Sequence, residues 1–127
     1  MDKRIKTVKA ALKALGYAED YKPPVRMWPA KIRKQKTAEF FLEMAIMALN
    51  KGWDPDYSNT SQPKWYIWWR IDNTSPGRGL VFGAVFCGRT VTNVGPRLVF
   101  ETREAALHAA KHFKKLYEAY YFALSEG

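Results

Sequence analysis

The sequence predicts an α+β fold in which three helices pack with a small, three-stranded antiparallel sheet, in the order α-α-β-β-β-α. Apolar residues recur at helical spacing in residues 1–51, alternate with period two from Lys64, and recur at helical spacing again after Thr102. The connections between the predicted strands are too short for parallel crossovers, so the strands should be antiparallel. The 127 residues suit a single domain, with a helical part at 1–51, a sheet at 64–100 and a C-terminal helix at 103–124.

Two helices are predicted in the N-terminal part. The first covers about residues 3–15, with Asp2 as its N-cap and Gly16 at its end. The second covers about residues 30–51 and stops at Gly52, because a residue without a Cβ adopts the left-handed conformation at no steric cost. Its second half is apolar nearly all round, so we expect it to be the buried central helix.

Three strands and one more helix fill the remainder of the chain. The strands are expected at residues 64–71, 80–86 and 90–100, and the third is interrupted at Gly95-Pro96. Residues 72–79 are rich in turn formers and should be a loop. Thr102 is the predicted N-cap of a last helix that continues to about residue 124.

Charge is distributed unevenly along the chain. The formal net charge is +9; residues 1–36 hold eleven Lys or Arg and three Asp or Glu, which gives +8, and the remainder contributes +1. A field of one sign concentrates anionic partners, of which nucleic acid is the commonest. A solvated surface that keeps the protein soluble is the alternative. The lone Cys87 excludes an internal disulfide, and no apolar run reaches bilayer length, so a cytoplasmic protein without membrane contact is expected.

No catalytic or cofactor-binding pattern stands out, and we predict that the protein is not an enzyme. His108 and His112 have the spacing of two metal ligands on one helical face, but no further ligand pattern accompanies them. Asp54 and Asp56 flank a proline and are typical of a turn rather than of a nuclease carboxylate pair. Phosphate-binding glycine loops are missing from the sequence, so no cofactor and no metal is expected.

Two groups of residues are candidates for nucleic-acid contacts. The first is the set of cations at the start of the second predicted helix: Lys31, Arg33, Lys34 and Lys36. The second lies on the first predicted strand, where rings could stack on unpaired bases and cations could meet phosphates: Lys64, Tyr66, Trp68 and Arg70. The alternative for the second group is that helices cover both faces of the sheet and place these rings in the core. We favour that alternative for the rings.

Four segments of the chain resemble small proteins encoded by phages and prophages of Bacteroidetes bacteria. Those proteins show A-L-N-E-G-W-x-P-D-W, K-Y-Y-P-W-F, V-G-S-R-L-x-F and A-x-x-F-x-x-L-Y-x-x-Y. This chain reads A-L-N-K-G-W-D-P-D-Y at 48–57, K-W-Y-I-W-W at 64–69, V-G-P-R-L-V-F at 94–100 and A-K-H-F-K-K-L-Y-E-A-Y at 110–120. Ile67 stands where the family has a proline, and Lys51 where it has an acid. The resemblance implies a phage-related origin in a bacterial cytoplasm and no particular chemistry.

The leading hypothesis from the sequence is a non-enzymatic phage or prophage accessory protein that binds nucleic acid through its basic N-terminal surface. The alternative is a protein-interaction or dimerisation module that uses the aromatic sheet to dock a host or phage protein. The sequence leaves open the choice between DNA, RNA and protein as partner, the oligomeric state, the stage of the phage cycle and the exposure of the aromatic strand face.

Overall fold

The computed structural model describes residues 1–72 and 79–126, which form four α-helices, two short 3₁₀ helices and two β-strands. In chain order these are α1 Val8–Ala14, η1 Val25–Met27, η2 Ala30–Ile32, α2 Arg33–Asn50, β1 Lys64–Asp72, β2 Gly79–Gly88, α3 Arg103–His112 and α4 Lys114–Glu126. Most of the loop predicted at 72–79, residues 73–78, lies outside the described residues. No helix in the described ranges is long and apolar enough to cross a membrane.

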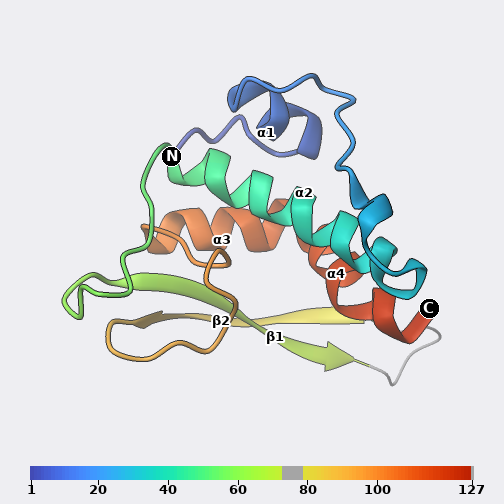
Figure 1. Ribbon diagram of the computed structural model, residues 1–127. Coiled ribbons are helices and arrows are strands. Elements are labelled where there is room, and N and C mark those ends of the chain that lie inside the picture. Colours follow the sequence, from blue (N-terminus) through green and yellow to red (C-terminus); the bar gives the residue numbers. More distant parts are fainter. Residues whose placement is uncertain (73–78, 127) are drawn as a thin grey trace.

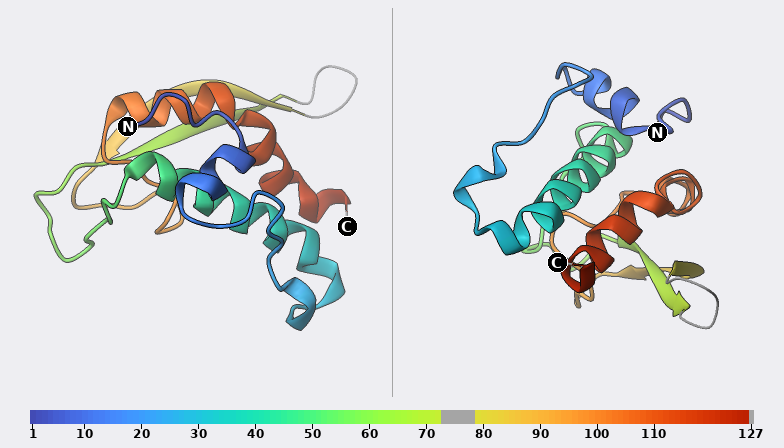
Figure 2. Two further views of the ribbon diagram at one scale, coloured as in Figure 1. Left: turned by 90° about the horizontal axis from the view of Figure 1, so that it is seen from above. Right: turned by 90° about the vertical axis from the view of Figure 1, so that its right-hand side faces the viewer.

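The elements form stacked layers, with the sheet at one side of the molecule and α1 at the other (Figure 1). Helix α3 packs on both strands, α4 packs on α2 and β2, and α1 packs on α2. Figures 1 and 2 together show the helices on one side of the sheet. Within the described residues no helix covers the opposite face, so the sheet has one inner and one outer face.

Helix α1 is shorter than predicted because its N-cap is Thr7 and not Asp2. The Thr7 side chain accepts a hydrogen bond from the Ala10 N–H. Asp2 instead binds the side chain of Arg4, in the segment before the helix begins. At the other end Gly16 adopts a φ of +86°, the left-handed conformation that favours glycine, and the N–H groups of residues 16 and 17 close a Schellman motif on carbonyls of the last turn.

Helix α2 is the central helix, as its apolar second half predicted. Its inward residues are fully buried and include Leu42, Ile46 and Leu49. The helix begins three residues later than predicted, because Ala30–Ile32 form the tighter η2. It ends at Asn50, and both Lys51 and Gly52 have positive φ angles, of 48° and 85°. The left-handed stop therefore lies at Lys51, one residue before the predicted position, and Gly52 follows it with a positive φ as expected of a glycine.

Within the described part of the chain the sheet has two strands, so the prediction of three is wrong. β1 pairs antiparallel with β2, and one extra residue of β2 forms a bulge opposite Trp68 and Trp69. In the segment after β2, backbone pairing with the sheet is limited to Phe100, which forms a single bridge to Trp65. Its other backbone groups are used differently: Leu98 N–H closes a turn on the Gly95 carbonyl, and Pro96 has no N–H to offer a ladder.

The predicted C-terminal helix 103–124 is two helices. Thr102 caps α3 as predicted, accepting a hydrogen bond from the Ala105 N–H. Phe113 then leaves the helical conformation with φ −118° and ψ 17°, and α4 begins at Lys114. The apolar spacing runs across this break, so the sequence pattern does not reveal it. The bend buries the Phe113 ring and turns α4 from the sheet toward α2.

A buried side chain, Asn50, ties the end of α2 to the segment that re-enters the sheet. Its Nδ2 donates to the Val99 carbonyl at 3.1 Å, and its Oδ1 accepts from the Glu101 N–H at 3.1 Å. Both backbone groups lie beside the Phe100 bridge to β1. Asn50 thus stands in for two backbone hydrogen bonds and fixes α2 relative to the sheet.

Candidate nucleic-acid interface

The connector between α1 and α2 is held in place by Arg33. The Arg33 Nε donates to the Trp28 carbonyl at 2.8 Å, and its Nη2 donates to the Arg26 carbonyl at 3.1 Å. A guanidinium is suited to this because its donors form a fixed fork. The side chain predicted as a phosphate contact therefore also orders residues 26–28, and it retains its positive charge while doing so.

Lys36 makes two contacts within the protein. Its Nζ lies 4.6 Å from the centroid of the Trp28 ring and 3.5 Å from a carboxylate oxygen of Glu39. The cation–π contact holds the indole against α2, and the carboxylate partly neutralises the ammonium. Lys36 is consequently a weaker candidate for an anion than the cations before it.

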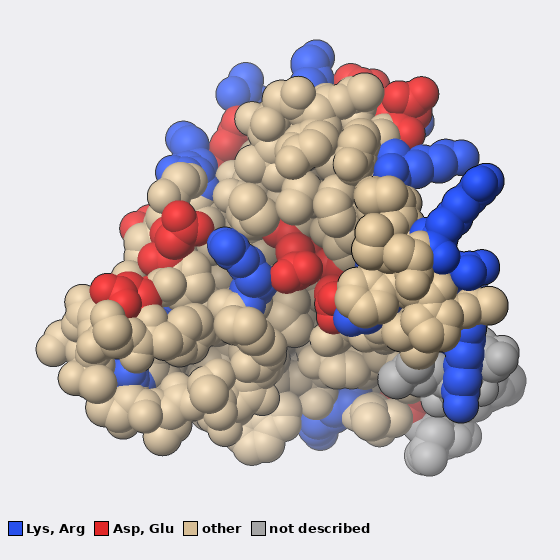
Figure 3. Space-filling view, viewed as in Figure 1, with Lys and Arg blue, Asp and Glu red and all other residues tan. Residues whose placement is uncertain are grey.

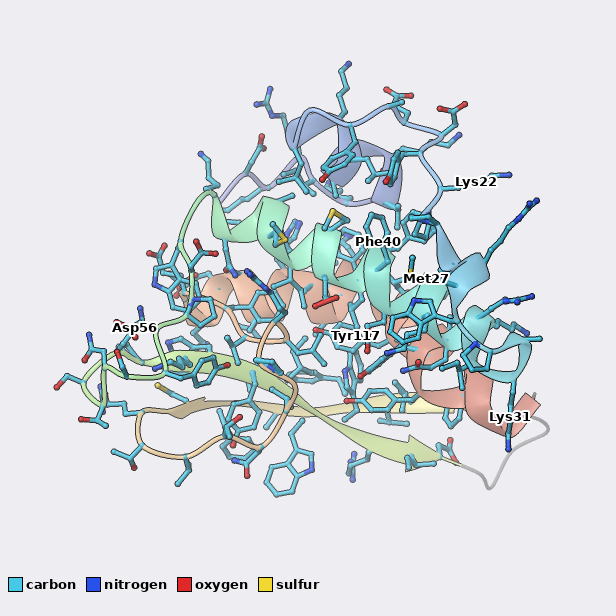
Figure 4. All side chains as sticks on the ribbon, viewed as in Figure 1. Lys22, Met27, Lys31, Phe40, Asp56 and Tyr117 are labelled. Carbon is cyan, nitrogen blue, oxygen red and sulfur yellow. The ribbon has the colours of Figure 1, made fainter. Side chains whose placement is uncertain are left out.

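A group of five cations on the connector and at the start of α2 forms what we call the basic ridge: Lys22, Arg26, Lys31, Arg33 and Lys34. All five are exposed, and no Asp or Glu occurs between residues 21 and 38. Figure 3 shows several Lys and Arg side chains projecting from one edge of the molecule, and Figure 4 places Lys22 and Lys31 on that side. Two apolar side chains lie among them, Met27, which is 79% exposed, and Trp28.

The positive charge of the N-terminal quarter does not gather into one surface. The cations before residue 14 belong to α1 and the segment before it, at the far side of α2 from the sheet (Figure 1). One of them, Arg4, is paired with Asp2, whose pKa falls to about 2 because the Arg4 side chain hydrogen-bonds its carboxylate. The basic ridge is therefore a local feature of residues 22–34.

The outer face of the sheet carries a second group, the aromatic face, which consists of Tyr66, Trp68 and Phe86. The ring centroids of Tyr66 and Phe86 are 6.1 Å apart, and those of Trp68 and Phe86 are 5.0 Å apart. The Trp68 side chain is 59% exposed, and Arg70 lies exposed two residues further along the same strand face. The expectation that helices cover both faces of the sheet is wrong, because all four lie on one side.

Lys64 is not available for an external contact, although the sequence made it a candidate. It is 4% exposed, and its Nζ donates to the carbonyls of Asn59 at 3.3 Å and Gln62 at 3.2 Å. The ammonium also lies 5.1 Å from the centroid of the Tyr57 ring. Lys64 instead anchors the loop before β1. Its burial keeps the ammonium from contacting a nucleic acid, so the prediction of Lys64 as a contact residue is corrected.

The paired histidines and aspartates have structural partners. The His108 and His112 rings lie 4.5 Å apart, and His108 Nε2 is 2.7 Å from the Ile5 carbonyl, to which it donates. In residues 1–72 and 79–126 no group of three or more His, Cys, Asp or Glu could hold a metal ion. Asp56 accepts hydrogen bonds from Ser58, which lower its pKa, and Asp54 pairs with Arg97 at 3.3 Å. Both aspartates belong to the loop after α2.

Sequence reasoning named some members of these two surfaces and missed others. It named Lys31, Arg33 and Lys34 of the basic ridge, and Tyr66 and Trp68 of the aromatic face. It missed Lys22 and Arg26 of the basic ridge and Phe86 of the aromatic face, and it also missed Met27 and Trp28, which lie among the ridge cations. For the missed cations a signal existed, since the run without acids extends back through the proline-rich connector. For Phe86 the signal is the strand register, which places it directly opposite Tyr66.

The fold and surfaces define a basic α+β protein, with four helices on one face of a two-stranded antiparallel sheet and aromatic rings on the other. No protein-family model, curated protein or solved structure matches this chain.

Proposed function

We propose that this protein binds nucleic acid through the basic ridge, by contacts to the phosphate backbone that do not depend on sequence. The observation that supports this proposal most is that five exposed cations lie within residues 22–34, in a stretch that contains no acidic residue. Because each phosphate contact releases condensed counterions, a ridge of this kind gives affinity that falls steeply with salt.

The ridge is ordered before any ligand arrives, which supports its use as a binding surface. The connector contains three prolines that restrict its backbone, Pro23, Pro24 and Pro29. The Arg33 guanidinium also donates hydrogen bonds to two carbonyls of the connector. Ordering a flexible basic arm on binding costs conformational entropy, and a preformed ridge avoids much of this cost. Arg33 and Lys34, in the first turn of α2, also oppose the helix dipole by up to about 1 kcal/mol each, a cost that an anionic partner would offset.

The aromatic face favours single strands over duplex as the ligand. Unpaired bases stack on exposed rings with about 1–3 kcal/mol per base, whereas the bases of a duplex are already stacked on one another. Trp68 and its neighbours offer such rings, and Arg70 lies on the same face. A phage or prophage origin, which the resemblance implies, is compatible with this activity and remains part of the proposal.

The test measures binding of a fluorescent single strand and its duplex at a series of salt concentrations. The informative variant is Lys22→Gln/Lys31→Gln, and its matched control is Lys9→Gln/Lys13→Gln, which removes the same charge from exposed positions on α1. We expect the ridge variant to reduce the slope of log K against log salt by roughly 1.4–1.8, the equivalent of two phosphate contacts. The control should change the slope much less.

Two outcomes would overturn the proposal. One is the absence of any binding by the wild-type protein to either oligonucleotide at low salt. The other is an equal loss in the two variants, because this would show that total charge and not the ridge attracts the ligand.

A further inference from the structure

One edge of β1 is unpaired for most of its length. β2 occupies the other edge from residue 64 to residue 72. On the free edge, Trp65 exchanges both backbone hydrogen bonds with Phe100, at 2.9 Å and 2.7 Å, and the chain that carries Phe100 then leaves the sheet. Beyond this bridge the described residues add no further strand, so the edge from residue 66 onward is open.

The backbone groups on this edge can be assigned from the bridge. In an antiparallel strand, alternate residues direct their N–H and C=O groups to the same edge. Because Trp65 faces the free edge, Ile67, Trp69 and Ile71 do so too. The bulge does not change this alternation, since the extra residue, Gly83, is inserted in β2 and leaves β1 regular. Among the described residues, nothing occupies these three consecutive pairing positions.

The open edge borders a groove of about 400 Å³. Its walls include Ile67, Trp69 and Ile71 from the strand, Val94 from the segment before Phe100, and Tyr121 from α4. The Trp69 Nε1–H is buried and has no hydrogen-bond partner among the described residues. Ile71 is 71% exposed. An apolar groove beside an unpaired strand edge is the arrangement that an added strand fills.

We propose that the occupant is the β1 strand of a second copy of this chain, paired antiparallel about a two-fold axis at Trp69. In this register Trp69 of one protomer pairs with Trp69 of its partner, and Ile67 pairs with Ile71 in both directions. All three free positions on each edge are then used. A two-fold arrangement of this kind is closed, so it gives a dimer and does not propagate.

The outer-face residues of β1 explain why a second copy fits and why this register is favoured. Trp68 of one protomer lies opposite Arg70 of its partner, so that a guanidinium faces an indole twice across the axis. Moving the axis toward the end of β1 by one residue places Arg70 opposite Arg70, which repels. Moving it the other way pairs Trp69 with Ile67 and brings Ile71 opposite Trp65, whose backbone groups already bind Phe100.

The dimer would contain one continuous four-stranded sheet, in the order β2-β1-β1-β2. The outer face of each protomer stays open, since the contact uses the strand edges. The two aromatic faces would then adjoin each other, while the helices of both protomers lie on the inner side. This inference is independent of the nucleic-acid proposal, because it rests on strand pairing within the protein alone.

The experiment is light scattering or sedimentation over a range of protein concentrations, without nucleic acid. We expect the wild-type mass to double with increasing concentration. Ile71→Pro removes an N–H that β2 does not use, and the symmetry removes it twice, so the dimer dissociation constant should rise about tenfold. Ile71→Ala keeps that N–H and is the matched control, which should dimerise nearly as wild type does. Circular dichroism checks that each variant is folded.

A charge exchange tests the register. Arg70→Glu and Trp68→Lys should each weaken the dimer, the first by removing the cation opposite the indole and the second by placing lysine opposite arginine. The double variant Trp68→Lys/Arg70→Glu should restore it, because the introduced ammonium of one protomer would face the introduced carboxylate of the other. A wild-type protein that stays monomeric at every concentration overturns the proposal. So does a dimer that Ile71→Pro, Arg70→Glu and the double variant leave unchanged.

Discussion

The two faces of the β1–β2 sheet are built from the same strands and similar residues, yet their surroundings differ. On the inner face Ile67 and Leu80 are buried in the core, and Trp69 packs on Tyr117 of α4, with ring centroids 5.2 Å apart. On the outer face Trp68 is exposed beside Phe86. Neighbouring tryptophans in the sequence thus serve different purposes. The difference teaches that position relative to the helix layer, and not residue type, decides between core and surface.

Truncating one residue on each face should give the largest contrast. Ile67→Ala should lower the free energy of unfolding by about 2–5 kcal/mol, because it leaves a cavity in the core, where Ile67 is only 5% exposed. Trp68→Ala removes a larger side chain from the outer face, but should cost less than about 1 kcal/mol. Chemical denaturation of both variants checks this. Equal losses would mean that the outer face is buried in solution.

The packing on the inner face also depends on the two hydrogen bonds that Asn50 makes to the segment beside Phe100, and Asn50→Ala should remove both. The substitution leaves the Val99 carbonyl and the Glu101 N–H without partners at about 1–3 kcal/mol each, so we expect a loss of roughly 2–6 kcal/mol in unfolding free energy. Asn50→Asp is the informative comparison, since it keeps the acceptor for Glu101 and loses the donor to Val99. A loss below about 1 kcal/mol for Asn50→Ala would show that these two hydrogen bonds contribute little to stability.

The bulge in β2 leaves no space for a side chain at Gly83. A Cβ at Gly83 would lie 2.6 Å from the Trp68 carbonyl oxygen, a backbone atom that cannot move aside without disturbing the pairing. Gly83→Ala should therefore destabilise the protein by about 1–3 kcal/mol. The control is Ala84→Gly at the neighbouring position, measured by thermal unfolding. A Gly83→Ala protein as stable as wild type would show that the bulge differs in solution.

The last expected effect is on binding and concerns the outer face alone. If unpaired bases stack on the aromatic face, Trp68→Ala should weaken binding of a single strand about tenfold, or about 1.4 kcal/mol. Duplex affinity should change little, because it depends on the basic ridge. Fluorescence anisotropy with both ligands measures the two effects. An equal change for single strand and duplex would remove the aromatic face from the proposed interface.

Much of the fold follows from local signals in the sequence. The alternation from Lys64 predicts β1, the apolar run before Leu49 predicts the buried helix, and Thr102 predicts a helix start. The features that were predicted wrongly depend on tertiary contacts. The apolar spacing continues through Phe113 although the helix breaks there, and residues 90–100 resemble a strand although only Phe100 pairs.

The candidate site was only partly predictable for the same reason. A run of cations without acids is visible in the sequence, so the centre of the basic ridge could be named. Alternation shows that Trp68 and Trp69 point to opposite faces, but it does not show which face the helices cover. Lys64 looks like any other strand-end cation, and only the fold of the preceding loop reveals that carbonyls surround its ammonium.

The enclosure of Lys64 has a consequence for chemical labelling of this lysine-rich chain. An amine is acylated only when its nitrogen is accessible to the reagent, and this one is enclosed by two carbonyls and a tyrosine ring. Under native conditions reagents that modify amines should react with Lys31 and leave Lys64 intact. Modification of Lys64 would then report, peptide by peptide, that the loop before β1 has opened.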